Sequence, residues 1–204
     1  QCDNGREFDN GAFHDFCAKN GMNFRFSCPH TSSQNGKAER MIRTINNRTR
    51  TLLHHASIPP SLWVYALRVS CYLHNIIPSK LLNNISPFHI LYRRIPLYAH
   101  LKVFGCLCFP NLTSTAKHKL SHRSIPCVFL GYPTNHRGYL CLEFTKNKLI
   151  ISRHVKFIES EFSFVKIPTV TSKSYNFLEN SDISPFITHH LTTIMLKQWL
   201  HLAY

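Results

Sequence analysis

The sequence SCPHTSSQNGKAERMIRTI, residues 27–45, passes from a polar loop into the start of a long amphipathic helix. Pro29 and the polar residues that follow it end any preceding strand. From residue 34 to residue 56 the apolar residues recur mostly at helical spacing, so they share one face of the expected helix. The opposite face is polar and contains Glu39, Arg43, Asn46 and Arg50.

Elements of mixed type are expected on both sides of this helix. Apolar spacing and terminal residues predict a short helix at 11–21, an aromatic strand at 23–28, and further helices at 61–77 and 86–94. The last helix has Ser86 as its expected N-cap and Pro87 at its first helical position, where proline is tolerated. Residues 1–95 are therefore predicted to form an α/β unit.

The pattern changes after Tyr98 to short apolar segments separated by turns. These segments are the expected strands at 101–109, 125–132, 138–144 and 148–157. Short strands that follow one another closely are typical of a small all-β barrel, which we place at residues 100–164. From residue 165 onward Ser, Thr and Asn become frequent and periodicity is lost, so residues 165–204 are expected to be an irregular, poorly ordered linker and tail.

The charge of the chain is strongly positive and unevenly distributed. Its 204 residues contain 24 Lys and Arg against 10 Asp and Glu, which gives a formal net charge of +14. No acidic residue lies between Glu39 and Glu143, a stretch that contains thirteen Lys or Arg. Nothing in that stretch neutralises the positive field, which favours a polyanion as partner over an idle basic surface.

Composition excludes several classes of protein. With 44% hydrophobic and 17% charged residues the chain can form a core, which argues against a disordered tail or a fibrous protein. No apolar run reaches the roughly 18 residues needed to cross a bilayer. The eight cysteines are scattered without a Cys-x-x-Cys pair, so we expect buried, reduced thiols rather than disulfides or a zinc site.

Two carboxylates occupy positions suited to binding a cation. Asp3 lies in DNGREF directly before a turn, as at the end of a strand, and Glu39 lies on the polar face of the long helix. Thirty-five residues lie between them. Carboxylates brought together from a strand end and a helix can bind a hard divalent cation, and paired cations catalyse phosphoryl transfer. Spacing alone is a weak signal, because any basic protein has some acidic surface residues.

The residues around these carboxylates make the interpretation more specific. The segments CDNGREF, SCPHTSSQNGKAERMIRTI and PPSLWVYALRVSCYLHNIIPSK resemble the integrase core of copia-type long-terminal-repeat retrotransposons. The segments VFGCLCFP, KLSHRSIPCVFLGYP, GYLCLEF and SRHVKFIESEFSF are similar to the SH3-like barrel that follows this core in the same polyproteins. The resemblance covers residues 1–164 and implies a Pol polyprotein fragment, with residues 1–95 as the C-terminal part of an RNase-H-like core.

The resemblance also implies a chemistry. The family uses an Asp, Asp, Glu triad, in which Asp3 matches the second Asp and Glu39 the Glu. Both would then be catalytic ligands for two Mg²⁺ or Mn²⁺ ions in DNA 3′-end processing and strand transfer. The first Asp is expected upstream of Gln1, so this chain alone is expected to be inactive and not to bind the ions productively. The expected contacts to DNA phosphates, with a solvated helix face as the alternative, are Arg40, Arg43, Arg48 and Arg50.

Partners and location follow from the same resemblance. The expected partner is DNA, both the element ends and the target. The expected location is the nucleus or cytoplasm and not a membrane, and self-association of the parent protein is left open.

Phe24 replaces a common His and Ser32-Ser33 replace a common Pro-Gln, which indicates relaxed constraint near the active-site loop. A non-catalytic module that binds nucleic acid or another subunit remains the alternative function.

Overall fold

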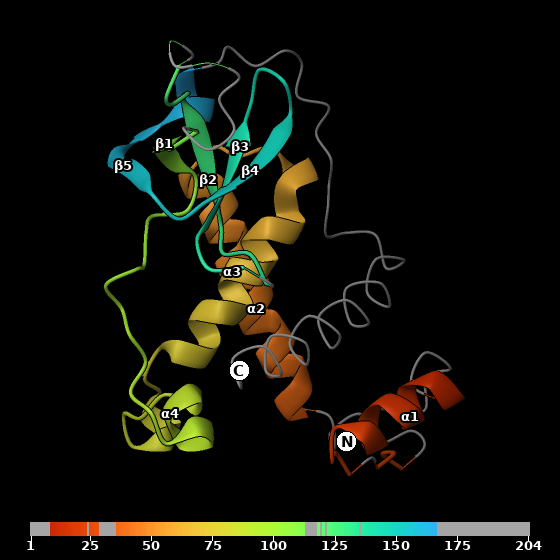
Figure 1. Ribbon diagram of the computed structural model, residues 1–204. Coiled ribbons are helices and arrows are strands. Elements are labelled where there is room, and N and C mark those ends of the chain that lie inside the picture. Colours follow the sequence, from red (N-terminus) through yellow and green to blue (C-terminus); the bar gives the residue numbers. More distant parts are fainter. Residues whose placement is uncertain are drawn as a thin grey trace. The chain divides into compact units, whose positions relative to one another are not determined.

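The structure is a computed structural model that describes residues 9–23, 25–28, 36–112, 118, 120, 122–134 and 136–166. Figure 1 shows the helices and strands in chain order. The chain divides into two compact units, and the boundary falls inside a long helix, between Thr44 and Ile45. No helix in the described part of the chain is both long and apolar enough to cross a membrane.

Helix α1 (Gly11–Lys19) confirms the first predicted helix. It begins at Asn10, whose side-chain oxygen accepts a hydrogen bond from the backbone N–H of Phe13 at 2.8 Å. The expected strand at 23–28 is not found, because among the described residues of this segment only Phe26 makes a bridge. Alternating aromatic residues form a strand only where a neighbouring strand supplies hydrogen bonds, and no strand of the described sheet pairs with this segment.

The remaining predicted helices are confirmed, with small changes at their ends. Ser86 caps the last of them as predicted, since its side chain accepts a hydrogen bond from the backbone N–H of His89 at 3.1 Å, and Pro87 occupies the first helical position. The helical elements after α1 are α2 (Gly36–His55), η2 (Pro60–Leu62), α3 (Trp63–Ile76), η3 (Lys80–Leu82) and α4 (Pro87–Tyr92).

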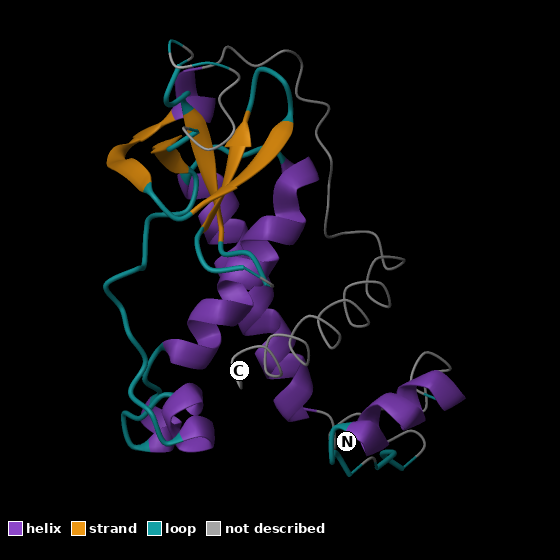
Figure 2. Ribbon diagram, in the orientation of Figure 1, coloured by secondary structure: helices purple, strands orange, loops and turns teal. Residues whose placement is uncertain are grey.

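Five antiparallel strands form one sheet with the order β4-β3-β2-β1-β5. They are β1 (Cys106–Pro110), β2 (Cys127–Gly131), β3 (Tyr139–Glu143), β4 (Lys148–Ser152) and β5 (Val155–Phe162), followed by the short helix η5 (Ser163–Lys166). The single strand predicted at 148–157 is wrong. Its two halves form β4 and β5, which lie at opposite edges of the five-stranded sheet drawn in orange in Figure 2. A turn at Arg153 and His154 separates the two strands in the sequence.

The sheet is covered on both faces, and β2 shows this most clearly because all five of its residues are buried. Successive side chains of a strand point to opposite faces. Val128 and Leu130 pack in one apolar cluster with Ala66 and Val69 of α3, which lies next to the sheet in Figure 1. The other face carries a second cluster, built from Cys106, Cys108, Cys127, Phe129 and Cys141.

Two glycines, Gly105 and Gly131, allow the backbone beside the sheet to lie close to apolar side chains outside it. Gly131 has a φ of 118°, and a Cβ there would lie 2.6 Å from Cγ2 of Val69 in α3. Gly105 has a φ of 80°, and a Cβ there would collide with the side chain of Ala56. This bend at Gly105 explains why residues 101–105 of the predicted strand at 101–109 lie outside β1.

The described cysteines are all free, which confirms the expectation of reduced thiols for this part of the chain. Cys28 is exposed. The buried ones are Cys17, Cys71, Cys106, Cys108, Cys127 and Cys141.

The predicted division into domains stays a prediction. Because α3 packs on the sheet, residues from Ile45 onward group with the strands in one compact unit. The predicted domain boundary between residues 95 and 100, and the RNase-H-like core at 1–95, stay predictions. Residues 167–204, most of the predicted tail, lie outside the described residues.

Candidate nucleic-acid interface on helix α2

One face of α2 is anchored on α3 by buried hydroxyl groups. The Thr49 Oγ1 lies 2.9 Å from the carbonyl oxygen of Ile45 and 3.1 Å from Oγ of Ser70, and both Thr49 and Ile45 are buried. The Ser70 hydroxyl in turn donates to the carbonyl oxygen of Ala66 at 2.8 Å. Because this face is packed, the opposite face of α2 is the one available to a ligand.

Three exposed arginines share that opposite face. Arg43 and Arg50 are seven residues apart, so their side chains leave the helix within about 20° of one another. Arg40 lies three residues before Arg43, and its Nε donates a hydrogen bond to the carbonyl oxygen of Gly36 at 3.0 Å. The spacing predicted from the sequence is therefore present as a row of cations along α2.

Arg48, the fourth predicted contact, is placed differently. It is partly buried, and its Nη1 lies 3.3 Å from Nδ1 of His74 in α3. Arginine has no acceptor, so Nδ1 of His74 accepts this hydrogen bond. Burial, and then the charge of Arg48, lower the pKa of His74. Arg48 therefore contacts α3 instead of joining the exposed row.

The predicted catalytic carboxylates are not brought together by anything the structure describes. Glu39 is exposed in the first turn of α2, where the helix dipole favours a negative charge. Asp3 lies outside the described residues. The assignment of both residues as catalytic metal ligands stays a prediction.

The described residues do not by themselves fit a divalent metal ion. Among them, no group of three or more His, Cys, Asp or Glu lies close enough to bind one. Glu39 alone offers a single carboxylate, whereas a magnesium site needs further carboxylate, phosphate or water oxygens around the ion. We therefore derive no metal-dependent step from the described part of the chain.

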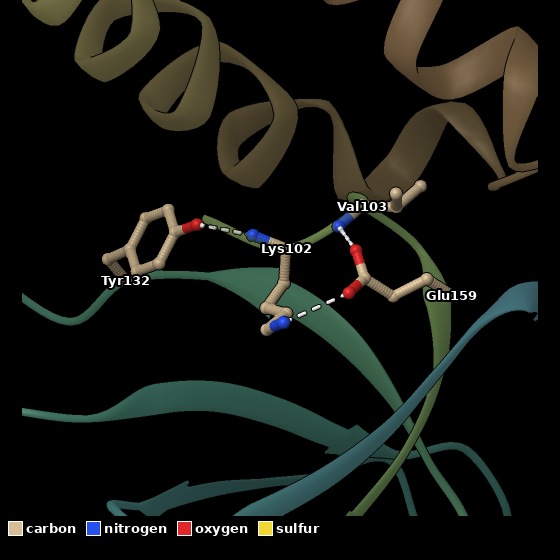
Figure 3. Close-up of polar contacts among 4 residues, drawn as sticks. All are labelled: Lys102, Val103, Tyr132 and Glu159. Atoms are coloured by element: carbon tan, nitrogen blue, oxygen red, sulfur yellow. Dashed lines mark hydrogen bonds and ion pairs between the residues drawn. The ribbon is translucent and has the colours of Figure 1, made fainter. Parts of the chain in front are cut away.

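A polar network that sequence reasoning did not find joins the segment before β1 to the barrel (Figure 3). The Glu159 carboxylate accepts hydrogen bonds from Lys102 Nζ and from the backbone N–H of Val103, both at 3.0 Å. The backbone N–H of Lys102 donates to the Tyr132 hydroxyl at 3.1 Å. The bonds from Lys102 and Val103 lower the pKa of Glu159. No sequence signal predicts these contacts, because the partners lie 30 to 57 residues apart.

A second basic region that the sequence did not single out is an open groove along β5. Its volume is about 1080 Å³. Arg123, Arg153 and His154 are among the residues that line it. Arg153 and His154 lie between β4 and β5, directly before the first residue of β5.

Comparison with known families agrees with this architecture. The model of the retroviral polymerase SH3-like domain matches residues 106–182. The match begins at the first residue of β1, and it supports the SH3-like barrel expected after residue 100. It extends past the expected end of the barrel at residue 164.

Curated proteins match a longer part of the chain. The Retrovirus-related Pol polyprotein from transposon RE1 of Arabidopsis thaliana is 45% identical over 162 residues, 79% of this chain. The corresponding protein from transposon RE2 of the same plant is 40% identical over 190 residues, 93% of this chain. That from transposon TNT 1-94 of Nicotiana tabacum is 40% identical over 159 residues, 78% of this chain. The chain spans 11%, 13% and 12% of the length of these three relatives.

Proposed function

The chain belongs to the Pol polyproteins of copia-type LTR retrotransposons, and we propose that it serves DNA integration by binding DNA phosphates through the exposed arginines of α2. The observation that carries this proposal is the row formed by Arg40, Arg43 and Arg50 on the face of α2 opposite Thr49. Several cations along one face release several counterions from DNA at once, and contacts to phosphates need no particular base sequence.

The catalytic part of the proposal rests on the family resemblance. Asp3 and Glu39 would contribute two of the three carboxylates that bind Mg²⁺ or Mn²⁺, and the bound ions would supply the stabilisation of phosphoryl transfer in end processing and strand transfer. Since these 204 residues match two members of the triad, we expect the chain alone to join no DNA ends. The parent protein would act on DNA inside the cell, in the nucleus or cytoplasm.

A second candidate is a non-catalytic module that binds nucleic acid or another subunit. The observation behind it is the same exposed arginine row, since contacts to phosphates require no catalytic carboxylate. The two candidates share the arginine face and differ in whether the carboxylates matter. A strand-transfer assay with Mg²⁺ on the parent protein separates them: Glu39→Gln should abolish the joining of DNA ends if Glu39 is a metal ligand, and joining that is unchanged by Glu39→Gln contradicts the catalytic candidate.

DNA binding on α2 can be tested with a salt series. We would measure the affinity of the full chain for a 20-base-pair duplex between about 50 and 200 mM salt, for wild type and for Arg43→Ala plus Arg50→Ala. Each phosphate contact contributes about 0.9 to the slope of log affinity against log salt. The double variant is expected to flatten the slope by about 1.8.

A matched control removes two exposed arginines outside α2, with Arg94→Ala plus Arg137→Ala. Both double variants lower the formal net charge by the same amount, so a general charge effect changes both slopes equally. The proposal requires the slope to change in the α2 variant alone. A slope that stays at the wild-type value when Arg43 and Arg50 are removed rules out α2 as the DNA-binding face.

A further inference from the structure

The groove beside β5 is lined largely by that strand and the two residues before it. Seven consecutive residues, 153–159, line it. Since neighbouring side chains of a strand point to opposite faces, a hollow that touches every one of these residues reaches both faces of β5, and Phe109 and Asn111 extend it over the side of β1 as well. The remaining lining residues are Lys102, Phe109, Asn111, Arg123, Ser124 and Tyr139.

Among the described strands, none pairs with β5 on the side away from β1. In the described sheet β5 pairs with β1 alone and is an edge strand. It has eight residues, whereas each of the other four strands has five, and a long open edge is a template for a further strand.

The register shows which backbone groups face that open side. The Asn111 N–H donates to the carbonyl oxygen of His154 at 2.9 Å, just before the ladder begins. In an antiparallel pair, positions alternate between groups that bond the neighbour and groups that point away. The N–H and C=O groups of Val155 and Phe157 therefore point to the open edge. Pro110 lies opposite Val155, where its missing N–H costs no ladder bond.

The groove carries excess positive charge. Arg123, Arg153 and Lys156 are exposed lining residues, and none of them forms an ion pair with the described acidic residues. The acidic lining residue Glu159 is already bonded to Lys102 and to the Val103 N–H. A ligand that complements this groove therefore carries negative charge.

The aromatic side chains of the groove favour a peptide over a nucleic acid. Bases bind such grooves by stacking on free ring faces. The Phe157 ring instead packs edge-on against Tyr139 at 4.9 Å and against Phe129 at 5.4 Å between centroids. Lys102 Nζ lies 5.6 Å from the centroid of the same ring. The Phe157 and Tyr139 rings are thus part of the core packing, and the groups left to a ligand are backbone groups, cations and the Ser124 hydroxyl.

We propose that this groove binds an extended acidic peptide of a protein partner, which adds to the sheet as a further strand beside β5. The backbone groups of Val155 and Phe157 bond the peptide backbone, and Arg153, Lys156 and Arg123 contact its carboxylates. This surface is separate from the arginine face of α2, so it does not rest on the proposed DNA binding.

The test uses the full chain and three fluorescent probes. The first is an eight-residue peptide of alternating glutamate and valine, the second has lysine in place of glutamate, and the third is an eight-nucleotide oligothymidine. We expect the acidic peptide to bind and the lysine peptide not to bind. We also expect the acidic peptide to slow hydrogen exchange at the amides of Val155 and Phe157 by about tenfold or more.

Variants locate the binding site. Arg153→Glu plus Lys156→Glu is expected to weaken binding of the acidic peptide by about tenfold or more, since two favourable charge contacts become repulsive. The matched control, Arg137→Glu plus Lys148→Glu, changes the net charge equally at exposed residues outside the groove and is expected to change affinity less than about twofold. Arg153→Gln plus Lys156→Gln gives a milder pair, used if the glutamate variants do not fold, and is expected to weaken binding in the same direction.

Three results would overturn the proposal. One is no binding of the acidic peptide to the folded wild-type chain. The second is an equal loss of affinity in the groove variant and the control. The third is protection of Val155 and Phe157 by oligothymidine in competition with the peptide, which would assign the groove to nucleic acid. Arg43→Ala plus Arg50→Ala should leave peptide affinity unchanged, so failure of the DNA-binding proposal is distinguishable from failure here.

Discussion

The carboxylate of Glu159 accepts a hydrogen bond from the backbone N–H of Val103 at 3.0 Å, although the two residues are 56 positions apart in the sequence. Lys102 Nζ contacts the other oxygen of the same carboxylate at 3.0 Å. The segment that enters the barrel is thereby fixed to β5, the last strand of the sheet. One side chain thus connects the beginning and the end of the barrel.

Replacing Glu159 by Gln should lower the free energy of unfolding at pH 7 by about 1 kcal/mol. Charge-assisted hydrogen bonds can contribute more, but the Glu159 side chain is 39% exposed and solvent screens its charge. Hydrogen bonds from Lys102 and Val103 lower the pKa of Glu159 in the folded chain. Their contribution is therefore present above the unfolded pKa of about 4.3 and is lost as pH falls through the lower folded pKa. Urea unfolding at several pH values measures the difference from wild type.

A double-mutant cycle with Lys102→Ala isolates the ion pair from the bond to Val103. If Glu159→Gln lowers the free energy of unfolding as much in the Lys102→Ala background as in wild type, the ion pair contributes nothing to stability. An energy difference between wild type and Glu159→Gln that stays constant down to pH 3 contradicts the role assigned to the carboxylate.

Gly105→Ala should destabilise the chain by about 2–4 kcal/mol. A φ of 80° strains any residue with a Cβ, and the new methyl group would collide with Ala56 and lie 2.8 Å from Cδ1 of Ile58. Gly11→Ala is the control, because no atom lies within 4 Å of a Cβ at that helical position. Thermal unfolding followed by circular dichroism should show a large decrease in the midpoint temperature for Gly105→Ala and no decrease for Gly11→Ala. Equal behaviour of the two variants would contradict the close approach at Gly105.

The helices were predictable from the sequence because their signals are local. Ser86 and Pro87 mark the start of α4 by their own chemistry, and the apolar period of α2 places Arg43 and Arg50 on one face. The exception at Arg48 was not predictable, since it depends on His74 in another helix. Asp3 cannot be compared in this way because it lies outside the described residues.

The strands were located less precisely because sheet pairing is not local. Residues 148–157 contain no Gly, Pro, Asn or Asp that would signal a turn, and only the polar run Ser152-Arg153-His154 interrupts the apolar pattern. That break is set by the partners of the two halves, β3 for one and β1 for the other. The groove beside β5 was missed for the same reason, because its walls come from segments that only this pairing brings together.

The buried thiols of the sheet should resist alkylation in the folded chain. Burial raises the pKa of Cys106 and Cys127 to about 12, and contact with the Cys141 thiol together with burial raises that of Cys108. The thiolate is the reactive form, so these cysteines stay unreactive from pH 7 to 9. Among the described cysteines, the exposed Cys28 should react first with iodoacetamide. Mass spectrometry of peptides from native and guanidinium-unfolded protein identifies the labelled sites, and labelling of Cys108 as fast as Cys28 would contradict this packing.

His74 should make stability fall as the solution becomes mildly acidic. Burial and the Arg48 charge lower its pKa in the folded chain, so the unfolded chain, with a pKa of about 6.5, binds the proton more readily. The free energy of unfolding therefore decreases as pH falls below about 6.5. His74→Asn keeps an oxygen acceptor for Arg48 without a titrating ring, and its loss of stability between pH 7.5 and 5 should be about 1 kcal/mol smaller than that of wild type.

His54→Asn is the control for this comparison, because His54 is exposed and lies in the same helix as Arg48. Burial also lowers the pKa of His100, and this contribution is common to wild type and both variants, so it cancels in the difference. Urea unfolding at pH 7.5 and 5 gives that difference directly. If His74→Asn loses as much stability as wild type and His54→Asn, the pKa of His74 is not lowered in the folded chain, which contradicts the placement of its ring in a buried site beside Arg48.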